Sequence, residues 1–195
     1  MGGGLDTATS ETDRLDVEAS LRGDEKAYGR LVRRYEGEIA AQMWRYTRDA
    51  NTLRELVQEV FVEAYHGLPR FKPRAPLLHW LRRIATRTGY RHWKTQARER
   101  RQWVPLEVWH DHAVDVDPGA LSPSEAAEHV TALLERLPPR DRIVLTLEYL
   151  EGCDTRTIAE RLGWSQTLVK VQAHRARRKL RAMLDELGYR REDHA

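Results

Sequence analysis

Basic side chains gather after Ser165, and no acidic residue interrupts them as far as Arg181. A run of basic residues without acidic ones can bind the phosphates of a nucleic acid electrostatically. Apolar residues recur along the same segment at helical spacing, so the basic side chains occupy the other faces of a single helix. The apolar stripe consists of Val169, Ala173, Ala176, Leu180 and Met183.

A shorter helix, expected over residues 155–162, precedes this segment, and Gly163 and Ser165 supply a turn and an N-cap between the two. This order is that of a helix-turn-helix, which binds DNA. The alternative is that these basic side chains only face solvent and bind no ligand. That alternative would not explain why a turn glycine and an N-cap precede the basic helix. We expect the start of the second helix to enter the major groove and later residues to contact phosphates. The predicted base-edge residues are Gln166, Thr167, Lys170, Val171 and His174, and the predicted phosphate-binding residues are Arg175, Arg177 and Arg178.

A second basic surface is predicted on a helix expected from Leu77 to about Arg98. Its cations are spaced by four, four, three and four residues, which places them on one ridge that matches a phosphate track. Aromatic residues lie between them and can stack on unpaired bases, although core packing is the stronger alternative for Trp80. The preceding loop, residues 69–76, contains three prolines and can form a stiff rim around an extruded base. The ridge is Arg83, Arg87, Arg91, Lys94 and Arg98, and the other candidate DNA-binding residues here are Lys72, Arg74, Trp80 and Trp93.

The charges of the chain are segregated along its length. Residues 82–101 contain eight Arg or Lys and one acid, whereas residues 102–135 contain seven acids and no Arg or Lys. Two polyanion-binding surfaces joined by a segment that the same polyanion repels would explain this pattern. The single cysteine, Cys153, excludes an intrachain disulfide and a cysteine-rich zinc site. No apolar run is long enough to span a bilayer, and the N-terminus lacks the pattern of a secretion signal, so we expect a cytoplasmic protein.

The hydrophobic periodicity predicts helices and no strands, hence an all-α protein with two small helical domains joined by an extended acidic linker. Expected N-caps include Asp24, Asp154 and a capping box of Thr52 with Glu55. The expected helices cover residues 24–46, 52–68, 77–98, 122–137, 139–150, 155–162 and 165–187. The expected divisions are a flexible N-terminus (1–20), an N-terminal domain (21–102), the linker (103–122), a C-terminal domain (123–188) and a tail (189–195).

Taken in order, these segments resemble a bacterial sigma factor of the extracytoplasmic-function (ECF) type, a member of the sigma-70 superfamily that keeps only regions 2 and 4. The resemblance covers nearly the whole chain. The segments that carry it are DEKAYGRLVRRY (24–35), ELVQEVFVEAY (55–65), FKPRAPLLHWLRRIATRT (71–88), LERLPPRDRIVLTLEYLEG (134–152) and IAERLGWSQTLVKVQAHRARRKL (158–180).

The resemblance implies that the protein binds core RNA polymerase, through the β′ clamp helices and the β flap, and directs it to promoters. It implies that the loop and helix around residues 72–98 bind the melted minus-ten element, and that the helix-turn-helix reads the minus-thirty-five element. An anti-sigma factor is expected as a further partner. Arg87 and Arg91 depart from the Asn and Asp common in the family, which makes this ridge more basic than usual. The residues implied in polymerase binding, which lie off the apolar stripe of their helix, are Glu55, Gln58, Glu59 and Val62.

Two other classes of function compete with this interpretation. A stand-alone helix-turn-helix regulator would explain the C-terminal half alone, and it would bind its site unaided. An iron enzyme is the second alternative, because two residue pairs fit the Glu-x-x-His ligand pattern of helical bundles. These pairs are Glu63 with His66 and Glu107 with His110. Those ligands must project inward from helices, and neither pair is predicted to do so. We therefore predict no enzymatic activity, no catalytic residue, no metal and no cofactor.

Overall fold

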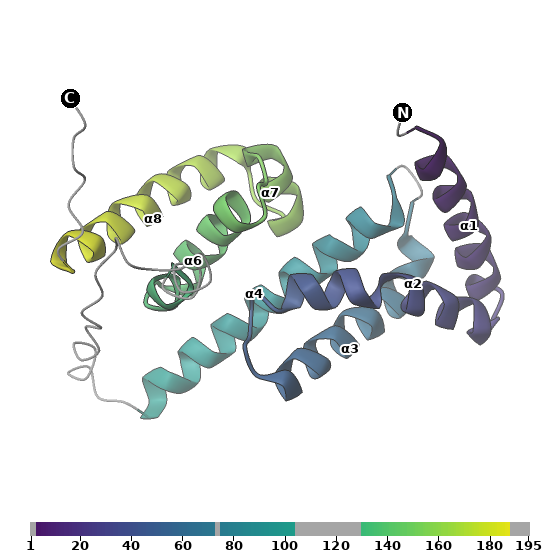
Figure 1. Ribbon diagram of the computed structural model, residues 1–195, viewed down its shortest axis with the longest axis horizontal. Helices are drawn as coiled ribbons and strands as arrows, with labels where there is room; N and C mark the ends of the chain where they lie inside the picture. The colour runs from purple at the N-terminus through teal and green to yellow at the C-terminus, as the bar shows by residue number, and fades with distance from the viewer. Residues whose placement is uncertain (1–2, 73–74, 104–129, 188–195) are drawn as a thin grey trace, which may run out of the picture. The chain divides into compact units, whose positions relative to one another are not determined.

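The computed structural model describes residues 3–72, 75–103 and 130–187, and every regular element within these ranges is a helix (Figure 1). The predicted all-α class is therefore confirmed. Residues 130–135 are helical as well. The elements in chain order are α1 (Gly3–Leu21), α2 (Glu25–Met43), α3 (Ala50–Gly67), η1 (Leu68–Arg70), α4 (Leu77–Trp103), α6 (Pro139–Leu145), the π-helical turn η3 (Thr146–Leu150), α7 (Thr155–Leu162) and α8 (Gln166–Glu186).

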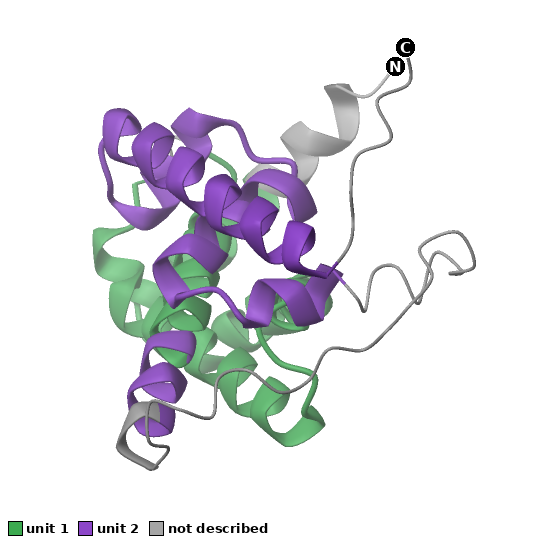
Figure 2. Cartoon of the chain, turned by 90° about the vertical axis from the view of Figure 1, so that its left-hand side faces the viewer, with its two compact units in different colours: residues 1–92 green, residues 93–195 purple. Residues whose placement is uncertain are grey.

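The chain divides into two compact units, residues 1–92 and residues 93–195 (Figure 2). The division falls inside α4, whereas the sequence placed the end of the first domain at residue 102. A boundary inside one continuous helix changes neither the residue composition nor the helical periodicity, so it could not be predicted from the sequence pattern. Most of the predicted linker lies outside the described residues.

The first unit packs α2 and α3 against each other and buries one side of α4. Ile39, Val60 and Ala85 are fully buried in its core. Gln42 is buried as well, and its side-chain amide donates to the Thr86 hydroxyl at 3.1 Å and to the Arg82 carbonyl at 3.3 Å. Buried polar groups require such partners, so this contact fixes how α2 lies on α4.

The expectation of a flexible N-terminus is wrong, because α1 packs against α2. Asp13 and Asp16 are each only 5% exposed, and both bind Arg34 of α2, at 2.6 and 2.8 Å. Asp16 also accepts from the Arg30 guanidinium at 2.8 Å. The weak hydrophobic period of this segment concealed the helix, since ion pairs hold it in place more than an apolar stripe does.

The predicted capping box at Thr52 is also wrong. Asp49 is the N-cap of α3, in extended conformation, and its carboxylate accepts from the Thr52 backbone N–H at 2.6 Å. The N-cap thus lies three residues earlier than expected, since an aspartate can cap as well as a threonine. The predicted cap of α2 is confirmed, because the Asp24 carboxylate accepts from the backbone N–H groups of Lys26 and Ala27.

The second unit forms the predicted helix-turn-helix. The Asp154 carboxylate caps α7 by accepting from the Thr157 N–H at 2.7 Å, and the Ser165 hydroxyl caps α8 by accepting from the Leu168 N–H at 3.2 Å. Gly163 has φ of 69°, the left-handed conformation that the turn requires and glycine adopts at no steric cost. A core of apolar side chains supports these helices: Leu134, Leu137, Leu145 and Ala176, with Leu180 and Met183 packed against them.

Candidate nucleic-acid interface

The exposed side of α8 carries the residues predicted to read DNA. Val169, Ala173 and Ala176 are buried, as the apolar stripe required. The eight candidate residues are all exposed: Gln166, Thr167, Lys170, Val171, His174, Arg175, Arg177 and Arg178. Their side chains therefore share one solvent-facing surface of a capped helix, which is the arrangement that a recognition helix needs.

Two acidic residues of the preceding elements bind polar and basic side chains of α8. Asp141, 2% exposed, accepts hydrogen bonds from the Gln172 amide and from the Lys179 ammonium. Glu148 binds Arg177, whose Nη1 lies 2.9 Å from both carboxylate oxygens. Asp141 is buried and needs such partners, whereas Glu148 is only partly buried; the two acids together fix α8 on the preceding α6 and η3. Neither acid is predictable from the periodicity of α8, so the sequence did not indicate these two contacts.

The ridge on α4 is exposed. Arg83, Arg87, Arg91, Lys94 and Arg98 all lie at the surface. Arg91 is bound to two carboxylates of α3, Glu59 at 2.8 Å and Glu63 at 2.5 Å. One predicted phosphate ligand is therefore neutralised within the protein, and the same contact shows that Glu63 is a partner of Arg91.

The aromatic residues near the ridge are packed to different degrees. Trp80 is partly buried, and its ring lies 5.1 Å from that of Phe71, at the start of the proline-rich loop. Lys72 is exposed, whereas Arg74 lies outside the described residues.

Trp93 was predicted to bind DNA by stacking on bases, which requires an exposed ring, but the residue is only 2% exposed. It follows the fully buried Thr86 by seven positions, which on a helix places both on one side. Its charged neighbours in sequence therefore did not indicate where its ring lies.

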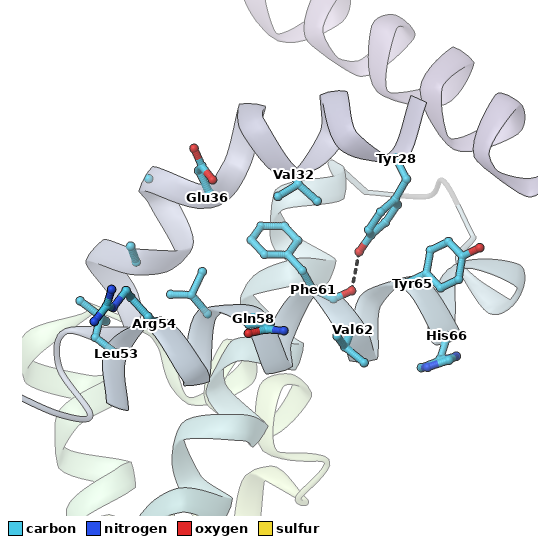
Figure 3. A pocket seen from close by; sticks show the side chains of 13 residues that line it. Tyr28, Val32, Glu36, Leu53, Arg54, Gln58, Phe61, Val62, Tyr65 and His66 are labelled. Carbon is cyan, nitrogen blue, oxygen red and sulfur yellow. Dashed lines mark hydrogen bonds between the residues drawn. The ribbon is translucent and has the colours of Figure 1, made fainter. Parts of the chain in front are cut away.

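A groove of about 690 Å³ runs between α2 and α3 in the first unit (Figure 3). Val62 and Gln58, two of the predicted polymerase-binding residues, line it, and Glu55 and Glu59 are exposed on the same helix. Tyr65 is 48% exposed and lies at one end of the groove. The apolar stripe of α3 is thus wider than one neighbouring helix can cover.

Tyr28 of α2 fixes one side of this groove. Its hydroxyl donates to the Phe61 carbonyl at 2.5 Å, and its ring meets that of Tyr65 edge-on with centroids 5.0 Å apart (Figure 3). Burial raises the pKa of Tyr28 to about 12, so the hydroxyl keeps its proton and remains a donor at neutral pH. These contacts therefore fix the distance between α2 and α3, the two walls of the groove.

A helix-turn-helix with an exposed, basic second helix, together with a second basic face, defines the class of helical DNA-binding proteins. Comparison with known sequences identifies which one. The Sigma-70 region 2 family matches residues 31–99, and the Sigma-70 region 4 family matches residues 127–180. The chain is 30% identical over 174 residues to the ECF RNA polymerase sigma-E factor of Haemophilus influenzae, covering 85% of this chain and 92% of that protein.

A second relative is the RNA polymerase sigma-H factor of Pseudomonas aeruginosa, at 30% identity over 189 residues, with 92% of this chain and 97% of that protein covered. The chain belongs to the ECF sigma factors of the sigma-70 superfamily, which direct transcription initiation by RNA polymerase. The resemblance seen in the sequence is thereby confirmed.

Two solved structures are similar to this chain. CnrH, in complex with the cytosolic domain of CnrY, has 25% identity and a TM-score of 0.56, with 90% of this chain and 98% of that chain covered. RpoE of Bartonella quintana, in complex with the anti-sigma factor NepR, shares the fold at 20% identity and a TM-score of 0.55, covering 82% and 98%. Among the described helices of this chain, none combines the length and apolarity needed to cross a membrane.

Proposed function

We propose that this sigma factor docks on core polymerase through the face of α3 and the groove beside it, and reads a two-part promoter with α4 and α8. The observation that carries the proposal is the exposure of all eight recognition residues on a capped α8, with its apolar stripe buried beneath them. That face has the cations and polar side chains that base edges and phosphates require.

The groove between α2 and α3 suits the β′ clamp helices, because its lining is mostly apolar and because α3 also exposes acidic side chains beside it. Val62, 48% exposed, offers an apolar contact, while Glu55 and Glu59 can pair with basic side chains. The β flap is the proposed partner of the second unit.

The minus-ten element is the proposed ligand of the basic ridge on α4. Arg83, Arg87 and Lys94 would contact phosphates of the melted strand, and Lys72 would contribute from the loop. The minus-thirty-five element is the proposed ligand of the residues exposed on α8. The protein would help to open the duplex by trapping unstacked bases, with no catalytic chemistry of its own.

An anti-sigma factor is a further proposed partner, since the related CnrH and RpoE structures were solved with CnrY and NepR. The proposed place of action is the bacterial cytoplasm, where RNA polymerase works.

Substitution of Val62 by Arg tests the polymerase-binding face. A buried charge would oppose docking, so we expect the affinity for core polymerase to fall by tenfold or more, as measured by fluorescence anisotropy of the labelled protein. Leu15→Arg is the matched control, because Leu15 is 55% exposed on α1 and does not line the groove. Equal affinities of the two variants would move the polymerase site elsewhere. Binding of a promoter with equal strength in the absence of core would instead favour a stand-alone regulator.

A further inference from the structure

Arg91 occupies the margin between α4 and α3. A single guanidinium nitrogen, Nη2, lies 2.8 Å from Glu59 Oε1, 2.5 Å from Glu63 Oε1 and 3.4 Å from the Thr88 hydroxyl. Thr88 is fully buried on the same helix, one turn earlier. The arginine therefore reaches across from α4 to two successive turns of α3.

The charges of this cluster oppose phosphate binding. One guanidinium and two carboxylates sum to a net charge of −1, so an approaching phosphate would meet an excess of negative charge at short range. Burial lowers the pKa of Arg91, but the hydrogen bonds that it donates to Glu59 and Glu63, together with their charges, outweigh burial and raise the pKa. The cation thus stays charged and bound to the protein.

The neighbouring cations of the ridge lie on either side of this cluster. Arg87 lies one turn before Arg91 and Lys94 nearly one turn after it, and both are exposed. Arg91 itself reaches across to α3 and is bound there by two carboxylates.

We propose that Arg91 is a positioning residue: it fixes α4 on α3 through Glu59 and Glu63, and so sets where the DNA-binding ridge lies relative to the polymerase-binding face. It does not bind promoter phosphate itself. This inference rests on the proposed function, since Glu59 belongs to the face of α3 assigned to polymerase and Arg87 to the face assigned to DNA. Glu63 keeps Arg91 in place when a polymerase side chain engages Glu59.

Holoenzyme formed from core polymerase and the full chain provides the test. Open-complex formation is followed with a fluorophore in the promoter minus-ten region, at saturating sigma factor and at several salt concentrations. Arg91→Ala should slow opening by about threefold to tenfold and leave the salt dependence of promoter affinity unchanged. Arg87→Ala should lower the slope of log affinity against log salt by about 0.7 to 0.9, the loss of one phosphate contact. Arg14→Ala, which removes an exposed pair with Glu18 on α1, should change neither quantity.

A charge exchange separates positioning from DNA contact. Arg91→Glu alone should slow opening more than Arg91→Ala, because three carboxylates then face one another. Adding Glu63→Arg places a cation between Glu59 and the new glutamate, and opening should return to within about twofold of the wild-type rate. A wild-type salt slope in this double variant completes the expected result.

If Arg91→Ala lowers the salt slope by about one contact, or if the double variant opens no faster than Arg91→Glu, Arg91 binds phosphate and the inference is wrong. Failure of the proposed function would give a different result, because even the wild-type holoenzyme would then open no promoter.

Discussion

Arg177 and Glu148 form an ion pair that joins α8 to η3, with the guanidinium nitrogen Nη1 2.9 Å from each carboxylate oxygen. Arg175, two residues earlier on α8, is exposed and forms no ion pair within the described residues. Two arginines that were both predicted to bind phosphate therefore differ in their freedom to bind DNA.

Arg175→Ala should weaken promoter binding by the holoenzyme and lower the slope of log affinity against log salt by about 0.9, because one phosphate contact is lost. Arg177→Ala should change the slope less, since Glu148 already neutralises that cation. Affinities measured by filter binding at several salt concentrations give both slopes. Equal slopes for the two variants would show that DNA draws Arg177 away from Glu148.

Gly89→Ala should destabilise the first unit. A β-carbon at Gly89 would lie 2.2 Å from Cδ1 of Tyr46, whose ring is 2% exposed, so α4 and the ring would have to separate. Overpacking of this kind costs about 1 to 3 kcal/mol, measured as the free energy of unfolding in urea.

Gly37→Ala is the matched control for Gly89, since a β-carbon there meets nothing within 4 Å on the exposed side of α2. That substitution should leave stability unchanged or raise it by up to about 1 kcal/mol, because alanine favours the helix. A Gly89→Ala protein as stable as the Gly37→Ala protein would show that Tyr46 moves aside freely.

The pairing of α1 with α2 should depend on pH. Burial by itself would raise the pKa of Asp16, but hydrogen bonds from Arg30 and Arg34 and their charges outweigh it and hold the pKa below its ordinary value of 3.8. A carboxyl with a lowered pKa stabilises the folded state fully above its unfolded value, and this contribution is lost as the pH falls below 3.8 and through the folded value.

Asp16→Asn should therefore cost about 1 to 3 kcal/mol of unfolding free energy at neutral pH, and the difference from wild type should shrink in acid below the unfolded pKa. Urea unfolding at a series of pH values measures it. Glu18→Gln, on the exposed pair with Arg14, should cost at most a few tenths of a kcal/mol. A difference that is independent of pH would mean that Asp16 acts through packing alone.

Ser165→Ala should loosen the first turn of α8. Loss of the hydroxyl that accepts from the Leu168 N–H costs about 1 kcal/mol, which corresponds to roughly fivefold faster hydrogen exchange at that amide. Ser165→Asn keeps a capping oxygen and should preserve the wild-type exchange rate. Equal protection of the Leu168 amide in all three proteins would contradict a capping role.

The features that the sequence predicted depend on local chemistry. The caps at Asp24, Asp154 and Ser165 and the left-handed Gly163 are set by residues within one turn of where they act. Periodicity likewise placed Val169 and its stripe in the core. Local signals therefore predicted the helix-turn-helix almost completely.

The features that the sequence did not predict depend on contacts between distant segments. Asp13 and Asp16 look like surface acids until α2 supplies Arg30 and Arg34. Arg91 belongs to a uniform basic ridge until α3 brings two carboxylates to it, from residues 28 and 32 positions away. Spacing along one helix shows which side chains share a face, but it does not show what the neighbouring helix presents to them.

Transcription by core polymerase on a library of promoters, with and without this protein, tests the central claim most directly. We predict a defined set of start sites that appears only when the protein is present, preceded by two shared sequence elements at a fixed spacing. Val62→Arg should abolish these transcripts, and Leu15→Arg should retain them. An unchanged set of start sites, together with binding to core no tighter than that of an unrelated basic protein, would contradict the account.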